Sequence, residues 1–319
     1  MFVEKLNQIL PRILRAIRIA ARLGFRISKE TAHSVKNLSY SILRLDKGRL
    51  LMEMNYMLAY GSAEASLRLL WKFGLLELLL PIQAAYFVSH GFRRRDKRTN
   101  MLLVIIITHL LYAYSVLDYI VKRSLLSNLD KLLSPDKPCH SSLWVAILAF
   151  HKALSEQPRD PLVVAAFSLA IHNGGDMLEA VNIARRITKL HDVCFNELSE
   201  TQDLNPRALK DEVVNLATSL KRALNHMTDE QIVSVAMAGY PQAPYSDLVF
   251  IPWGLSLRVS RVFSCVTSGA ERGFVPKQGS KIDYESLAVG NLPEVRHIFA
   301  RVVFDTIYPL ILNRDNFET

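Results

Sequence analysis

Arginine recurs at helical spacing near the start of this 319-residue sequence. At about 100° of rotation per residue, Arg12, Arg15, Arg18 and Arg22 fall within an arc of about 120° on a helix over residues 11–23. The apolar residues of the segment cluster on the other side: Leu10, Ile13, Leu14, Ile17, Ala20 and Ala21. A guanidinium group stays protonated, and its planar fork binds phosphate oxygens or a base edge through paired hydrogen bonds. The pattern predicts a helix with one buried face and one face of cations directed at an anionic ligand.

A second group of basic residues follows further along the chain, and its members are Arg93, Arg94, Arg95, Lys97 and Arg98. Such a run contacts RNA phosphates, serves as a nuclear-import patch, or is a solvated loop, and we favour phosphate contact. Two aromatic residues lie close by in the sequence, Tyr86 and Phe92. They are candidates for stacking on unpaired bases and equally for the hydrophobic core.

The positive charge of the chain is concentrated in its first third. Residues 1–98 hold 18 Lys/Arg and 7 Asp/Glu, whereas the remaining 221 residues hold 21 and 23. A surface that neutralises phosphates has this polarity, because each cation placed on a phosphate releases condensed counterions. The distribution therefore indicates a nucleic-acid partner for the N-terminal part, with a solvated basic face as the alternative.

The sequence gives little indication of a metal-binding site or of a membrane-spanning segment. The three cysteines are far apart, which indicates a reducing intracellular compartment, with an organelle or the nucleus left open. The His191-Asp192 pair resembles half of a phosphohydrolase metal site, and Cys139-His140 is too short for a zinc site, so we expect no metal. No secretory signal is visible, and polar residues interrupt the apolar stretch Met101 to Ile120. We expect that stretch to form a buried helix and not a membrane span.

Helix punctuation recurs along the chain, and strand periodicity does not persist, which predicts an all-α fold. Pro11 is expected in the first turn of its helix, and Thr228 with Gln231 forms an expected capping box. Expected helix starts follow Ser28, Asp46, Ser62, Asn205 and Asn291, and expected ends lie at Gly24, Gly61 and Gly74. Composition divides the chain into a helical neck at 1–90, a helical body at 91–240 and a C-terminal helical tail at 241–319. Trp253 is expected to be packed at the body–tail junction.

The run from Arg12 to Phe25 resembles the fourth conserved motif of the class II polynucleotide nucleotidyltransferases, the family of bacterial poly(A) polymerases and CCA-adding enzymes. That motif reads Glu-Asp-x-x-Arg-x-x-Arg-Ala-x-Arg-Phe-Ala. The resemblance continues for about 80 residues through Ile27 to Ala32, Arg49 to Glu53, Gly61 and Leu69 to Leu80. It is closest to the poly(A) polymerase branch, which shares the run Leu-Pro-Ile-x-x-x-Tyr-Phe found here at Leu80 to Phe87.

The resemblance implies roles for individual residues. Arg12, Arg15 and Arg18 correspond to motif arginines that form part of the base template and approach the incoming nucleotide, while Arg22 would contact RNA. The motif's Glu-Asp pair falls on Gln8 and Ile9, and an isoleucine side chain cannot accept a hydrogen bond from adenine. The resemblance therefore implies RNA, at the 3′ end of a tRNA or mRNA, as the partner, with ATP held weakly.

The same resemblance implies a reaction whose catalytic carboxylates are not found in this sequence. The family adds nucleotides to RNA 3′ ends, with Mg²⁺ and ATP, using a pair of carboxylates in a head that precedes the neck. No Asp-x-Asp occurs in the sequence, so we expect no cofactor and no nucleotide addition by this chain alone. The interpretation is an RNA 3′-end processing protein of the polynucleotide adenylyltransferase type without its catalytic head. The alternative is a helical scaffold protein whose arginine face docks an acidic protein surface.

Overall fold

The computed structural model describes residues 2–89, 98–100, 102–103, 105–107, 124–188, 195–238 and 251–308. These residues form an all-α fold with a single two-stranded antiparallel ribbon among them. The N-terminal elements are α1 (Phe2–Leu23), α2 (Lys29–Leu38), η1 (Ser39–Arg44), α3 (Lys47–Leu58), α4 (Ala63–Phe73), α5 (Leu76–Leu79) and α6 (Pro81–Ser89). The ribbon follows as β1 (Arg98–Asn100) and β2 (Ile105–Ile107).

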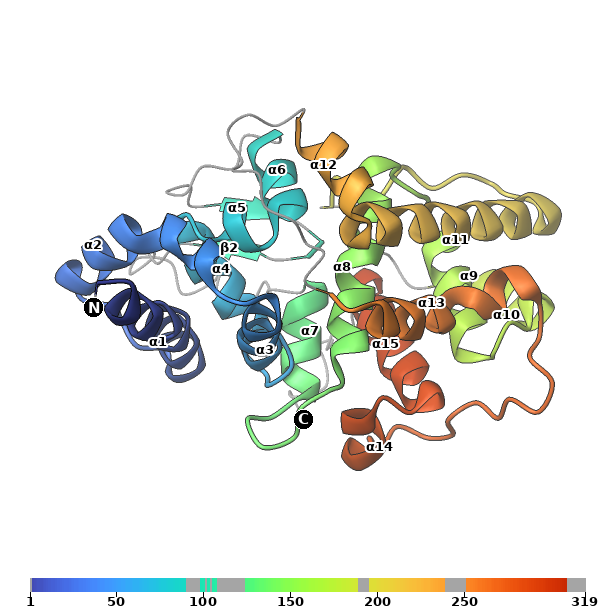
Figure 1. Cartoon of the computed structure of the whole chain (residues 1–319). Helices are drawn as coiled ribbons and strands as arrows, with labels where there is room; N and C mark the ends of the chain where they lie inside the picture. Colours follow the sequence, from blue (N-terminus) through green and yellow to red (C-terminus); the bar gives the residue numbers. More distant parts are fainter. Residues whose placement is uncertain are drawn as a thin grey trace, which may run out of the picture.

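The remaining helices build the larger part of the molecule. They are α7 (Leu125–Leu132), α8 (Ser141–Glu156), α9 (Pro161–His172), α10 (Met177–Ala184), α11 (Pro206–Thr228), α12 (Glu230–Ala238), α13 (Trp253–Ser268), α14 (Tyr284–Val289) and α15 (Leu292–Ile307). Figure 1 shows helices α1 to α6 at one end of the molecule and α9 to α11 at the other. Helix α7 lies between them and packs against both α4 and α15. The N-terminal helices are thereby fixed to the rest of the fold.

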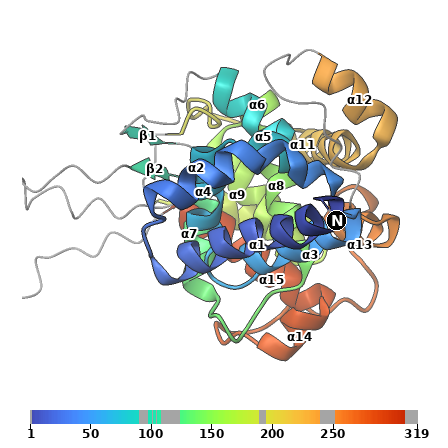
Figure 2. The same cartoon turned by 60° about the vertical axis from the view of Figure 1, so that its left-hand side comes forward.

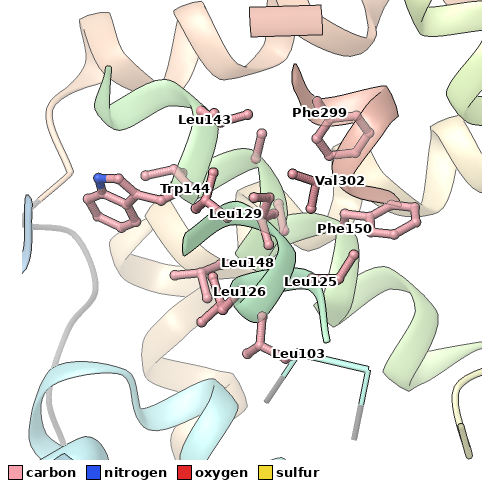
Figure 3. Close-up of a cluster of buried hydrophobic side chains, with 14 of the residues drawn as sticks. Leu103, Leu125, Leu126, Leu129, Leu143, Trp144, Leu148, Phe150, Phe299 and Val302 are labelled. Atoms are coloured by element: carbon pink, nitrogen blue, oxygen red, sulfur yellow. The ribbon is translucent and has the colours of Figure 1, made fainter. Parts of the chain in front are cut away.

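The central core is apolar and aromatic. Figure 3 shows Leu125 and Leu129 of α7 together with Leu148 and Phe150 of α8 and Val302 of α15. All five side chains are at most 1% exposed. Burying a side chain of this size stabilises a fold by roughly 1.5–3 kcal/mol. Because α15 is distant in sequence from the consecutive helices α7 and α8, this core holds the C-terminal part of the chain against its middle.

The C-terminal helices belong to this core. Helix α15 packs along α9, and α13 packs against α8, α9 and α11. The fully buried Arg296 of α15 donates to the backbone carbonyls of Arg261 and Val262 and to the carboxylate of Glu271, at 2.7 to 3.0 Å. A buried guanidinium needs such a set of acceptors, since an unpaired charge in the interior is costly. This network fixes α15 against α13.

Local signals in the sequence explain where the N-terminal helices begin and end. Gly24 adopts φ +67° after α1, and the Phe25 N–H donates to the Ala20 carbonyl, as in a glycine-terminated helix. Ser28 caps α2 by accepting from the Thr31 N–H at 3.1 Å. Asp46 caps α3 in the same way. These expected boundaries are confirmed.

Helix α4 is capped from a distance. Its Ser62 makes no side-chain cap, and the carboxylate of Asp130 on α7 instead accepts from the N–H groups of Ala63 at 2.8 Å and Glu64 at 3.0 Å. The positive end of a helix stabilises such a carboxylate. Burial nevertheless raises the pKa of Asp130 to about 7, with the two backbone hydrogen bonds acting in the opposite direction.

Several expectations from the sequence are corrected by the structure. Pro11 lies inside α1 and not in its first turn, because the helix begins nine residues earlier, at Phe2. Residues 105–107, expected within a buried helix, pair with β1 as a strand, and 108–123 lie outside the described residues. The capping box at Thr228 does not form, because α11 continues through Thr228 and Asp229 caps the next helix. Trp253 is 75% exposed, so it is not packed at a junction.

Candidate nucleic-acid interface

Helix α1 supplies one wall of the candidate site. Its apolar face is buried as expected, with Ile13 7% exposed and both Leu14 and Ile17 fully buried. The arginines occupy the other face: Arg12 and Arg15 are exposed, whereas Arg18 and Arg22 are partly covered. All four line the same groove. The predicted shared arginine face is therefore present in the structure.

Helix α3 supplies the opposite wall. Arg18 and Arg22, one turn apart on α1, contact Tyr56 of α3 and Tyr60, which follows the end of that helix. The two helices therefore run side by side in the same direction, which the intervening α2 and η1 make possible (Figure 2). The open groove between them has a volume of about 760 Å³ and is lined by Pro11, Arg12, Arg15, Arg18, Arg22, Arg49, Met52, Glu53, Tyr56 and Tyr60.

Arg18 lines the groove and has two neighbours on α3. Its guanidinium carbon is 4.7 Å from the ring centroid of Tyr56, and its Nη1 is 3.5 Å from Oε2 of Glu53. A guanidinium over an aromatic face is attracted by the ring quadrupole. Since the planar group is held between a ring and a carboxylate, its orientation is restricted before any ligand arrives. Less conformational entropy is then lost on binding.

Arg22 extends the same arrangement by one turn. Its guanidinium carbon is 5.2 Å from the Tyr60 ring centroid, and its Nη2 donates to the Tyr56 carbonyl at 3.4 Å. The two tyrosine rings lie 5.5 Å apart at an interplanar angle of 40°. At this end of the groove, each of the two arginines therefore contacts one of the two tyrosine rings. Within the described part of the chain, Nε of Arg22 has no hydrogen-bond partner.

The groove is strongly cationic. Among the described residues, five arginines line it against a single carboxylate, that of Glu53. Guanidinium groups bind phosphate oxygens, and aromatic rings provide stacking surfaces for bases that are not paired. Arg49, Met52, Tyr56 and Tyr60 were not among the site residues predicted from the sequence. The spacing of Met52 and Tyr56, four residues apart, is the signal that places them on one face of α3, and Tyr60 follows at the same spacing just after the helix ends.

The structure gathers four of the nine predicted site residues, those on α1, in one groove. Arg93, Arg94, Arg95 and Lys97 lie outside the described residues. Arg98 is in β1, and its side chain is likewise not described. Tyr86 is largely covered, and its ring meets that of the buried His151 at 5.1 Å. It belongs to a packed cluster and not to an open stacking surface.

Within the described residues, no group of three or more His, Cys, Asp or Glu side chains is placed to hold a metal ion. Cys139 is buried, and the Nδ1 atom of His140 accepts from the Ser142 N–H at 3.1 Å, which caps α8. Both side chains therefore have structural roles. His191 and Asp192 lie outside the described residues. The described helices include none that is long and apolar enough to cross a membrane.

An arginine-lined groove with aromatic residues, built on paired helices, defines a candidate nucleic-acid-binding site. Comparison with known proteins agrees with this class. Residues 24–87 match a family model described as "Probable RNA and SrmB- binding site of polymerase A". The matched region contains α2 to α5, most of α6, and the α3 wall of the groove.

Individual relatives point to the same family. Poly(A) polymerase I of Escherichia coli O6:H1 and of Escherichia coli O157:H7 is 36% identical to the chain over 80 residues, and that of Salmonella typhi is 34% identical. The alignments cover 25% of this chain and 17% of each relative. No solved structure matches the chain. This region of the chain is poly(A)-polymerase-like.

Proposed function

We propose that this chain binds the 3′ region of single-stranded RNA in the groove between α1 and α3, as the RNA-handling part of a poly(A)-polymerase-like protein. The observation that carries the proposal is the alignment of Arg12, Arg15, Arg18 and Arg22 along one groove. Successive phosphates of a strand are matched by cations spaced along a helix, and each neutralised phosphate adds to affinity by counterion release.

The tyrosines favour a single strand over a duplex. Tyr56 and Tyr60 line the groove and remain partly exposed. A stacking surface of this kind takes an unpaired base, whereas a duplex keeps its bases stacked on one another. A terminal nucleotide, or ATP held weakly by Arg12, Arg15 and Arg18, offers the same combination of base and phosphate. The proposed role is binding; AMP addition requires a pair of carboxylates that hold metal ions, and among the described residues Glu53 is the one carboxylate in the groove.

A protein contact is the second candidate, because the description of the matching family names SrmB beside RNA. Three large apolar side chains near the end of α1 are exposed: Ile19 by 41%, Leu23 by 56% and Phe25 by 64%. These side chains suit a protein surface better than phosphates. RNA binding should fall linearly with salt in a log–log plot and be displaced by homopolymeric RNA, whereas an acidic protein docked on the arginine face need not show either behaviour.

The test is filter binding of a single-stranded RNA across a salt series. Replacing Arg12, Arg15 and Arg18 with Ala should weaken binding and make the salt slope shallower by roughly 0.7 for each phosphate that is no longer neutralised. The matched control replaces three exposed arginines far from the groove, Arg185, Arg186 and Arg207, and should leave the slope nearly unchanged.

Comparing 3′-hydroxyl with 3′-blocked oligonucleotides tests the orientation of the strand. The variant lacking the three groove arginines should lose the discrimination between the two ends, because the family resemblance implies that these residues approach a terminal nucleotide. A groove variant with parental slope and affinity would remove the proposed function.

A further inference from the structure

Helix α13 carries large apolar side chains that are open to solvent. Trp253 is 75% exposed and Leu257 is 46% exposed, and their four-residue spacing places them on one face of the helix. Val289, at the end of α14, is 69% exposed. It adjoins α13, because Nη1 of Arg258 donates to its carbonyl oxygen at 3.3 Å. Three exposed apolar side chains therefore lie around the start of α13.

The exposure of Trp253 is exceptional within this chain. The other two tryptophans of the sequence, Trp71 and Trp144, are 4% and 0% exposed. A single exposed apolar side chain needs no explanation, whereas a group of them marks an interaction site. Tryptophan and arginine are also the residues most enriched among those that dominate binding energy at protein interfaces.

The charged side chains of this face are mainly cations. Arg258 and Arg261 of α13 are exposed, and the helix contains no Asp or Glu. Within the part of the chain that the structure describes, neither guanidinium is paired with a carboxylate. Arg261 follows Leu257 by four residues, so it continues the stripe that Trp253 begins. Helix α14 contributes one carboxylate, that of Glu285, so cations exceed anions on this face.

The start of α13 adds to the preference for an anionic partner. Pro252 precedes the helix without a side-chain cap, and no acidic residue lies in the first turn. The first N–H groups of a helix attract negative charge. An acidic polypeptide satisfies all of these features, because it carries carboxylates together with apolar side chains. A nucleic-acid strand supplies phosphates but no aliphatic group to pack on Leu257 and Val289.

We propose that the face formed by Trp253, Leu257, Arg258, Arg261 and Val289 is a docking surface for an acidic segment of a partner protein. An apolar side chain of that segment packs on Trp253, and its carboxylates pair with the two arginines. From Trp253 to Arg261 the stripe is about 12 Å long, which predicts a small interface and reversible binding. The surface lies on α13 and α14, outside the α1–α3 groove, so the inference goes beyond RNA binding.

The first test selects binding peptides from a random peptide library displayed on phage. The full chain is the bait, and a Trp253→Ala/Leu257→Ala variant removes the peptides that bind elsewhere. Peptides that the parent alone captures should be enriched, relative to the input library, in Asp and Glu together with a large apolar residue. If no peptide distinguishes the parent from the variant, or if the selected peptides lack carboxylates, the inference is wrong.

Fluorescence anisotropy with the most enriched peptide then measures the individual contacts. Trp253→Ala should weaken binding by roughly tenfold or more, the effect of removing a central interface residue. Replacing Arg258 and Arg261 with Gln should also weaken binding and should remove most of its salt dependence. The matched control is Leu178→Ala on α10, because Leu178 is likewise 75% exposed, and it should leave the affinity unchanged. Melting curves of each variant show whether the fold is retained.

Quenching of intrinsic fluorescence by acrylamide separates the classes of partner. Since Trp71 and Trp144 are buried, the quenchable fraction reports on Trp253, and the selected peptide should protect it. Protection by single-stranded RNA or by phosphatidylglycerol vesicles, and not by the peptide, would assign the face to a nucleic acid or a membrane and overturn the inference. Trp253→Ala should bind RNA as the parent does, so this surface and the proposed function can fail separately.

Discussion

The guanidinium of Arg18 lies 4.7 Å from the ring centroid of Tyr56, so the cationic wall of the groove is fixed against its aromatic wall. The two residues come from helices separated by α2 and η1. A ligand that contacts the arginines therefore meets the ring at the same time. The pairing explains why phosphate binding and base stacking are expected from one site and not from two.

Replacing Tyr56 with Ala should weaken binding of single-stranded RNA by roughly tenfold or more, because stacking on an aromatic side chain contributes about 1–3 kcal/mol per base. The salt slope should stay at the parental value, since no cation is removed. Filter binding across a salt series measures both quantities. Tyr56→Phe keeps the ring and should bind like the parent, so a strong loss in that variant would assign the effect to the hydroxyl group instead.

The basic run that contains Arg93, Arg94 and Arg95 should behave differently from the groove. Replacing Arg93, Arg94 and Arg95 with Ala should lower both RNA affinity and the salt slope, by up to roughly 0.7 for each phosphate of a single strand that these arginines neutralise. The loss should be equal for 3′-hydroxyl and 3′-blocked oligonucleotides, whereas the loss in the groove variant should depend on that end. If this variant has the same salt slope as the parent, these three arginines are solvated and do not contact RNA.

The features predicted from the sequence are those that local periodicity determines. Burial of Ile13 and Ile17 follows from helical spacing, and the cap at Ser28 follows from its side chain three residues before the N–H that it accepts from. Arg49 and Tyr60 were missed because their role depends on α3 packing beside α1, and no local pattern states which helices pair. The same holds for Asp130, whose partners in the chain lie 66 and 67 residues away.

Nucleotide addition should be absent when the purified chain is given RNA, ATP and Mg²⁺. Two-metal phosphoryl transfer needs carboxylates placed to hold the ions between attacking and leaving oxygens. The described residues offer no cluster of three or more such ligands, and Glu53 is the only carboxylate that they place in the groove. Incorporation of labelled AMP is the measurement, with a full poly(A) polymerase as the positive control. Incorporation that a chelator abolishes would contradict the prediction and reveal an unrecognised metal site.

The stability of the fold should depend on pH through Asp130. Burial raises the pKa of this carboxyl from its ordinary value of 3.8 to about 7 in the folded state, so the folded chain binds the proton more tightly than the unfolded chain does. The contribution of the protonated form is therefore fully present below about pH 4 and is lost as the pH rises through about 7. The parent and Asp130→Asn should be compared by urea unfolding. Over this pH range the free energy of unfolding of the parent should fall relative to that of the variant, by an amount on the order of a few kcal/mol.

Asp130→Ala removes the acceptor for the Ala63 and Glu64 N–H groups, and at pH 5 it should lower the free energy of unfolding by about 1–2 kcal/mol. If the free energy of unfolding of the parent instead rises with pH relative to that of Asp130→Asn, the prediction is wrong. The helix end and its two N–H donors would then lower the pKa of Asp130 by more than burial raises it.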